Sequence, residues 1–267
     1  MTLEPVQYLL GALSGSLVGF TLGLVGGGGS ILAVPLMVYL VGVRSPHLAI
    51  GTSAFAVAAN AAAGLMNHAR NGTVKWRCAL MYAGAGIAGA LAGSTVGKAF
   101  NGQKLLFLFA IVMIVVGVLM LRRRSELGNP GAECNRDNAP KVLGFGLGTG
   151  IFSGFFGIGG GFLIVPGLVA STGMPILNAI GSSLVAVTAF GLTTAVNYAA
   201  SGLIDWPLGV IFIVGGLAGS YTGARAAKRL AGTTGLLSKV FAITIFIVAG
   251  YMLWKSAGAI RGAPFFR

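Results

Sequence analysis

The residues best placed to do chemistry in this chain are two glycine runs, and the chemistry would be that of the main chain. The first run opens the segment GGGGSILAVP, from Gly26 to Pro35, and the second opens GIGGGFLIVP, from Gly157 to Pro166. Consecutive glycines break a helix and expose N–H groups, which at membrane depth must find a partner. The helix that restarts after each run presents an N-terminus, which attracts anions. The pattern therefore predicts two anion-attracting turns.

Composition indicates that these turns lie in a membrane protein. The chain has 267 residues, of which 55% are hydrophobic and 9% are charged, whereas a soluble domain carries about 25% charged residues. The net charge of +13 would suggest a nucleic-acid partner in a soluble protein. Here the basic residues fall mainly between and beyond the apolar segments, where they orient a membrane protein. No nucleic-acid partner is expected.

Apolar segments divide the chain into two similar halves and predict an all-α polytopic fold. The predicted segments are 6–25, 31–43, 46–67, 79–97 and 105–121 in the first half, and 142–156, 162–171, 178–200, 206–223 and 240–254 in the second. A helix of about twenty residues crosses a hydrocarbon core of roughly 30 Å, so 31–43 is the short returning arm of a hairpin. The predicted organisation is a first membrane repeat (1–121), a polar linker (122–141), a second membrane repeat (142–256) and a tail (257–267).

The two halves are copies of one unit. Pro166 follows Pro35 by 131 residues, and at nearly the same offset the block AIGTS, residues 49–53, matches AIGSS, residues 179–183. Trp76 and Trp206 correspond in the same way. Several matches, with small changes of the residue offset at loops, indicate a duplicated unit of about 110 residues.

Charges in equivalent loops predict that the copies are inverted. The loop after 46–67 carries Arg70, Lys75 and Arg77, whereas its counterpart in the second half carries only Asp205. The next loop reverses this bias. Opposite biases at equivalent loops are typical of inverted-topology repeats, because cytoplasmic loops collect basic residues. With the linker in the cytoplasm, 12 of the 18 basic residues lie inside.

The repeated glycine motif before an apolar proline, the length of the halves and the AIGTS block together resemble the sulfite exporter TauE/SafE family of membrane permeases. The resemblance covers almost the whole chain outside the linker and tail. It implies a secondary carrier, an exporter in the bacterial inner membrane, for sulfite, sulfoacetate or related organosulfonates. Ile158 replaces Gly27 and Gly161 replaces Ser30 between the two copies, so the two turns are not chemically equal.

Two half-helix N-termini would offer N–H donors to the three oxygens of a sulfite or sulfonate group. No Lys or Arg occurs in residues 5–43 or 142–204, so fixed dipoles rather than side-chain charges would attract the anion. The predicted substrate-binding residues are Gly27, Gly28, Gly29, Ser30, Thr52, Ser53, Asn60, Gly159, Gly160, Gly161, Ser182, Ser183 and Thr188. Two alternatives stay open at this point. The glycines can serve only close helix packing, and the hydroxyls can bond to their own helices.

Other polar residues have structural explanations. Asn67 and Asn197 stand at equivalent helix ends and are expected to cap them, and Trp76 and Trp206 fit interfacial anchors. Cys78 and Cys134 show no metal or redox spacing and receive no function.

Enzymatic functions are not expected, because five acidic residues and two histidines assemble no catalytic or metal-binding set. A carboxylate proton relay would need acidic residues inside the membrane, and only Asp205 comes near. We predict no cofactor, no metal and no catalytic residue; the predicted partners are a small anion and the lipid bilayer. Monomer and homodimer both stay open. An anion channel or uniporter for other small anions is the alternative function, and a membrane assembly factor without transport is a third.

Overall fold

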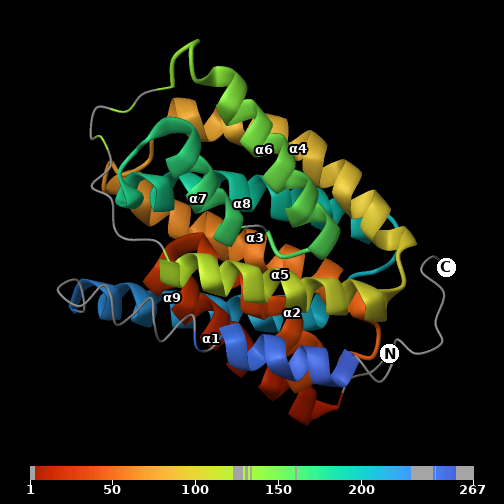
Figure 1. Ribbon diagram of the computed structural model, residues 1–267. Helices are drawn as coiled ribbons and strands as arrows, with labels where there is room; N and C mark the ends of the chain where they lie inside the picture. The colour runs from red at the N-terminus through yellow and green to blue at the C-terminus, as the bar shows by residue number, and fades with distance from the viewer. Residues whose placement is uncertain are drawn as a thin grey trace.

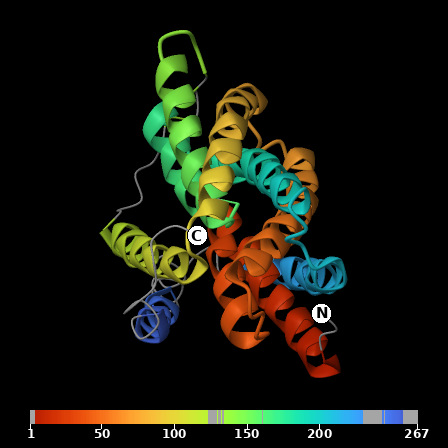
Figure 2. The same cartoon turned by 90° about the vertical axis from the view of Figure 1, so that its right-hand side faces the viewer.

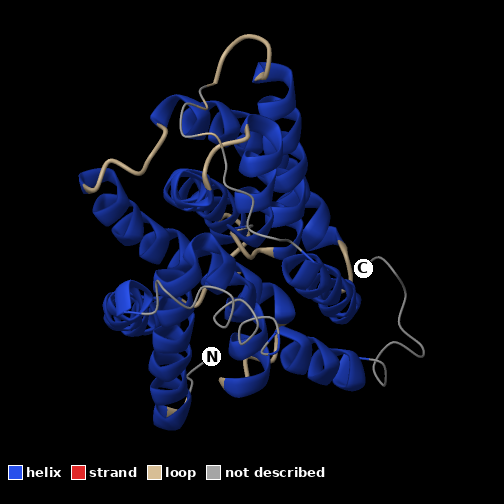
Figure 3. Cartoon of the chain, turned by 60° about the vertical axis from the view of Figure 1, so that its left-hand side comes forward, coloured by secondary structure: helices blue, strands red, loops and turns tan. Residues whose placement is uncertain are grey.

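Helices form along the apolar segments because main-chain N–H and C=O groups in lipid must be satisfied within the helix itself. A computed structural model describes residues 4–122, 129, 132, 134–159, 161–229, 243 and 245–256, and its ordered elements are helical (Figure 3). Within the described residues, six helices are long and apolar enough to cross a membrane. Three shorter apolar helices cover Gly28–Leu40, Gly161–Thr172 and Ile245–Ser256. The predicted all-α polytopic class is confirmed.

The first half contains α1 (Pro5–Val25), the 3-10 helix η1 (Gly26–Leu32), the short α2 (Ala33–Pro35), the π-helical η2 (Leu36–Leu40), α3 (Pro46–Arg70), α4 (Trp76–Ala99) and α5 (Gly102–Arg122). The second contains α6 (Ala139–Phe156), α7 (Gly161–Thr172), α8 (Ile176–Ala199), α9 (Trp206–Arg229) and the unlabelled helix Ile245–Ser256. The part of the last predicted segment that precedes residue 245 lies outside the described residues, except Ile243.

Three helix pairs form successive layers. α4 and α6 lie at one end of the molecule, α1 and α9 lie at the other, and α3 and α8 pack together between them (Figures 1 and 2). The first helix of each half therefore packs on the fourth helix of the other half. A two-fold relation between the halves would produce this exchange; the inverted orientation inferred from loop charges stays a prediction.

Glycine lets both outer pairs approach backbone to backbone. A Cβ atom on Gly15 would collide with the carbonyl of Phe212, and one on Gly93 would collide with the carbonyl of Ile151. Within each pair, glycines further along one helix contact residues further along the other. α1 therefore runs parallel to α9, and α4 runs parallel to α6. In lipid, where neighbouring helices gain little from hydrophobicity, such close packing supplies much of the association energy.

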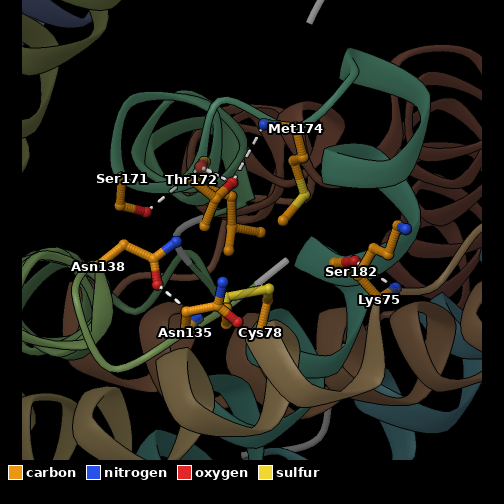
Figure 4. The surroundings of a disulfide bond; sticks show 10 residues. Lys75, Cys78, Asn135, Asn138, Ser171, Thr172, Met174 and Ser182 are labelled. Atoms are coloured by element: carbon orange, nitrogen blue, oxygen red, sulfur yellow. Dashed lines mark hydrogen bonds between the residues drawn. A yellow bond between two sulfur atoms is a disulfide. The ribbon is translucent and has the colours of Figure 1, made fainter. Parts of the chain in front are cut away.

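A disulfide joins the linker to the start of α4. The Sγ atoms of Cys78 and Cys134 are bonded, and both residues are 1% exposed. Figure 4 shows the bond next to Asn135, across from the end of α7. The linker is further fixed by a hydrogen bond of 2.9 Å from the Asn129 N–H to the Gly173 carbonyl. Nothing in the sequence indicated this pairing, because the two cysteines are 56 residues apart.

Candidate functional site

The first glycine run forms a tight 3-10 turn packed on the end of α1. A Cβ atom on Gly29 would lie 2.6 Å from Thr21 Oγ1, and the Thr21 hydroxyl donates to the Gly29 carbonyl at 3.4 Å. Gly27 and Gly28 belong to the same 3-10 turn, and Ser30 is fully buried.

The arm after this turn differs from the prediction. The sequence predicted one regular half-helix over 31–43, but η1, the short α2 and the π-helical η2 follow one another there. Pro35 has no N–H, which removes one bond of the α-helical ladder at the start of this arm. The Val41 N–H instead reaches the carbonyl of Leu36, five residues back, at 2.9 Å.

The second run turns more sharply and restarts a regular helix. α6 ends at Phe156, and Gly157 and Gly159 take positive φ angles of 67° and 65°, which glycine adopts without steric cost. α7 then begins at Gly161, as predicted for the half-helix, and keeps its α-helical form despite Pro166. Gly160 lies outside the described residues.

The two turns come from opposite halves and meet near the α3–α8 crossing. η1 packs against both α7 and α8. A Cβ atom on Gly159 would lie 2.9 Å from Val57 Cγ1 on α3 and 3.1 Å from Val187 Cγ1 on α8. Val57 and Val187 are equivalent positions of the repeat, so the second turn sits between the halves.

One stripe of α3 follows the second turn, and we call it the α3 stripe: Ser53, Val57 and Asn60. The Ser53 hydroxyl donates to the Ile50 carbonyl at 3.0 Å and to the Gly157 carbonyl at 3.4 Å. Val57 is the residue that faces Gly159, and Asn60 lies three positions further, which is a neighbouring position on the same helix face.

Asn60 is the polar residue of the α3 stripe that the fold leaves unsatisfied. It is 2% exposed, and neither its amide nitrogen nor its amide oxygen has a hydrogen-bond partner among the described residues. Its side chain lies against Gly216 of α9, where a Cβ atom would collide with the amide. Phe190 occupies the equivalent position in the second half and lies against Gly86 in the same way. A buried unpaired amide costs about 1–3 kcal/mol, so Asn60 is suited to a partner that the described residues do not supply.

Along the axis of α1, Asn60 lies within one helix turn of the first glycine turn. Gly216, against which it packs, contacts Gly19 on α1, and Gly29 packs against Leu22. Leu22 is three residues beyond Gly19, about 4.5 Å of helix rise. Among the predicted residues, Ser53 thus contacts the second turn, and Asn60 lies on the same stripe of α3.

Two of the predicted residues accept hydrogen bonds from loops of the opposite half. The Asp205 N–H donates to Thr52 Oγ1 at 2.9 Å, and the Lys75 N–H donates to Ser182 Oγ at 2.9 Å. Thr52 and Ser182 are equivalent, as are Lys75 and Asp205, so the repeated AIGTS block anchors the partner loop in each case. The substrate-binding role of Thr52 and Ser182 stays a prediction, and they do not enter the site proposed below.

The remaining predicted hydroxyls bond within α8. Ser183 donates to the Ile180 carbonyl at 2.7 Å, and Thr188 donates to the Leu184 carbonyl at 2.8 Å. Bonds of this kind are usual for hydroxyls in membrane helices. Ser183 corresponds to Ser53 in the repeat.

A polar cluster at the end of α8 could not be predicted from the sequence. The Lys98 ammonium donates to the Asn197 carbonyl, to Asn197 Oδ1 and to Ser201 Oγ at 2.8–2.9 Å. The Asn197 amide donates in turn to Ser94 Oγ at 2.6 Å. Asn197 was expected to cap its own helix, and instead it ties α8 to α4. A lysine at a helix C-terminus is favoured by the helix dipole, but nothing in the sequence indicates which helix it reaches.

The described glycines of both turns are buried in this structure. Gly28, Gly29, Gly157, Gly159 and Gly161 are all buried, and two surface grooves lie elsewhere, along α5–α6 and α4–α8. Ligand access would therefore need a movement of the helices around the turns. Among the described residues, no three His, Cys, Asp or Glu side chains come together as a metal site.

The sequence is similar to those of known membrane transporter proteins. The sequence profile of the family "Sulfite exporter TauE/SafE" matches residues 11–252. A "Probable membrane transporter protein" of Xylella fastidiosa is 50% identical over 264 residues, covering 96% of this chain and 98% of the relative. The "Probable membrane transporter protein YdhB" of Bacillus subtilis is 26% identical over 78% of this chain and 86% of its own length. No solved structure matches the chain significantly. With six helices able to span a bilayer and this match over nearly its whole length, the chain is a multi-pass membrane protein of the sulfite exporter TauE/SafE family.

Proposed function

We propose that this protein is a secondary carrier that exports small sulfur-containing anions, such as sulfite or organosulfonates, across a bacterial inner membrane. The observation that carries the proposal is that the first glycine turn packs against α7 and α8, while the second turn packs against the α3 stripe, which ends in the unsatisfied amide of Asn60. The main-chain N–H groups of the turns and the Asn60 amide supply hydrogen-bond donors to the oxygens of the anion. In carriers built from repeats, broken helices of this kind form the substrate site between the repeats.

The charge distribution supports an anion rather than a cation as substrate. The segments that form the turns contain no Asp, Glu, Lys or Arg. Asp205, which directly precedes the spanning helix α9, accepts the Leu208 N–H at 3.0 Å, which is a capping role. Partial positive charge at the start of α7 therefore dominates the local field. We infer a transport function without enzymatic activity or a resident cofactor.

Burial of the turns supports a carrier over a channel. Alternating access moves one repeat against the other around a fixed site and passes through closed states. A channel needs a continuous path, whereas the described turn residues are buried on all sides. Rocking of the α1–α9 and α4–α6 pairs around the α3–α8 crossing would open the site to each face in turn.

Counterflow of radiolabelled sulfite into proteoliposomes tests this function. Vesicles that contain the protein and are preloaded with unlabelled sulfite should take up the label faster than vesicles loaded with buffer. The reason is that the carrier then returns to the outer face with unlabelled sulfite bound, instead of returning empty. Protein-free vesicles with the same load give the background. Uptake without this acceleration would indicate the channel alternative.

We propose further that the linker faces the cytoplasm, because that orientation places 12 of the 18 basic residues inside. The disulfide lies on the linker side, and disulfides are rare in the reducing cytosol, so it favours the reverse orientation. Both cysteines are 1% exposed, however, and thiol exchange needs access to the sulfur. Burial would protect the bond in either compartment, so the charge bias decides our choice.

Cysteine labelling on the two faces checks this orientation. In a Cys78→Ser, Cys134→Ser background, a reporter Asp137→Cys lies on the exposed linker side, and a matched reporter Gln103→Cys lies at the α4–α5 turn on the other side. In spheroplasts, a membrane-impermeant maleimide should label the Gln103→Cys variant and reach the Asp137→Cys variant only after permeabilisation. The opposite pattern would invert the proposed topology.

A further inference from the structure

A groove on the outer surface lies apart from the glycine turns. It has a volume of about 710 Å³ and runs between α5 and α6, and Leu163 of α7 also lines it. Ile111, Val115 and Leu119 line one wall, and Phe145 and Phe152 line the other. Each of these five side chains is between 42% and 52% exposed, so the groove opens outward to lipid.

The groove carries one charge, and that charge lies at one end. Lys141 lines the groove in the first turn of α6, and no carboxylate among the described residues pairs with it. The other polar lining residue, Thr149, donates its hydroxyl to the Phe145 carbonyl at 2.8 Å and to the Tyr82 hydroxyl at 2.9 Å. Lys141 is therefore the polar group in the groove that is available to a ligand.

The length of the groove matches one leaflet of a bilayer. Eleven residues of α6 separate Lys141 from Phe152, which is about 16 Å of rise, and the hydrocarbon core is about 30 Å thick. Lys141 follows the polar linker, so the charged end lies at the membrane surface and the apolar end reaches the midplane. This is the shape and polarity of a phospholipid: a phosphate at the surface and an acyl chain below it.

We propose that this groove binds an anionic phospholipid of the bilayer, with its phosphate on Lys141 and one acyl chain between α5 and α6. α5 ends the first half and α6 begins the second, so the lipid contacts both halves at the junction that the linker spans. Leu10 stands where the repeat would place a counterpart of Lys141, so only the second half has this charge. The site is independent of the anion-binding turns.

Native mass spectrometry of the purified full chain tests the site with defined lipids. The protein is mixed with equal amounts of phosphatidylglycerol, which is anionic, and phosphatidylcholine, which is zwitterionic and has the same acyl chains. We expect phosphatidylglycerol to be retained preferentially, and soluble glycerol phosphate not to compete with it. Because one lysine near a membrane surface strengthens binding to anionic lipid, Lys141→Ala should lower phosphatidylglycerol retention about fivefold. Equal retention of the two lipids by the wild type would overturn the proposal.

Two matched pairs of variants separate the site from general effects. A Cβ atom on Gly148, which lines the groove, meets nothing within 4 Å, and the same holds for Gly84 on α4. Gly148→Leu should fill the groove and displace the lipid without disturbing the fold, whereas Gly84→Leu should keep it. Arg70→Ala removes a charge from the same face outside the groove and should also keep the lipid.

If Gly84→Leu lost the lipid as strongly as Gly148→Leu, or Arg70→Ala as strongly as Lys141→Ala, the result would contradict a defined binding site. Conversion of a dimer to a monomer by Gly148→Leu would also overturn the proposal, because a second copy would then occupy the groove.

Discussion

Replacing Gly93 by leucine is expected to separate α4 from α6 and to unfold the protein at a much lower temperature. A Cβ atom at this position already collides with the Ile151 carbonyl, which is rigid main chain. Overpacking costs about 1–3 kcal/mol where side chains can adjust, so we expect at least about 3 kcal/mol here. For a protein of this size, that corresponds to a fall of roughly 6–12 °C in melting temperature. Tryptophan fluorescence of the detergent-solubilised protein during heating measures it.

The control for this prediction lies on the same helix. Gly84 is exposed, and a Cβ atom there meets nothing within 4 Å. Leucine also favours helix over glycine by up to about 0.8 kcal/mol, so Gly84→Leu should melt within about 2 °C of the wild type or slightly above it. Equal melting temperatures for the two variants would show that the close contact between α4 and α6 does not hold the fold together.

Asn60→Leu is expected to raise the stability of the ligand-free protein and to abolish the response to the anion. Leucine has nearly the size and branching of asparagine but no polar atoms, and it removes a buried amide that lacks partners. The gain should be about 1–3 kcal/mol, measured as a higher melting temperature without ligand. A binding residue commonly costs stability in this way, whereas a merely structural asparagine would lower stability when replaced.

Thr194→Val provides the matched control for Asn60→Leu. Thr194 of α8 is 1% exposed, and its hydroxyl also lacks a partner among the described residues. Valine is nearly isosteric, so this variant should gain some stability as well, but it should keep the full anion response. A loss of the response in both variants would trace the effect to general core changes rather than to Asn60.

Sequence periodicity predicted the helices well because hydropathy reports where the chain meets lipid. α1 covers Pro5–Val25, and the predicted segment was 6–25. Hydropathy does not report where a helix ends in water. α9 therefore continues to Arg229, beyond the predicted end at residue 223. The turn at Gly157–Gly159 was predictable because positive φ angles favour glycine.

The rest depended on contacts between distant segments. The sequence could not show that the AIGTS block anchors loops of the other half, because Thr52 and Asp205 are 153 residues apart. It identified Asn60 as a candidate through its position after the hydroxyl pair, but not through its missing partners, which depend on the packing of α9. The Lys98–Asn197 cluster was hidden for the same reason, since any surface lysine can reach several helix ends.

The melting temperature of the purified protein with and without sulfite tests the central claim most directly. The claim is that main-chain donors of the two glycine turns, together with the Asn60 amide, bind a small sulfur-containing anion. A ligand that binds only the folded state at 100 times its dissociation constant stabilises it by about 2.7 kcal/mol. We predict that sulfite or sulfoacetate raises the melting temperature of the wild type by several degrees, and that Asn60→Leu abolishes this shift although it melts higher without ligand. A shift of equal size in Asn60→Leu, or none in the wild type with any sulfur-containing anion, would contradict the account.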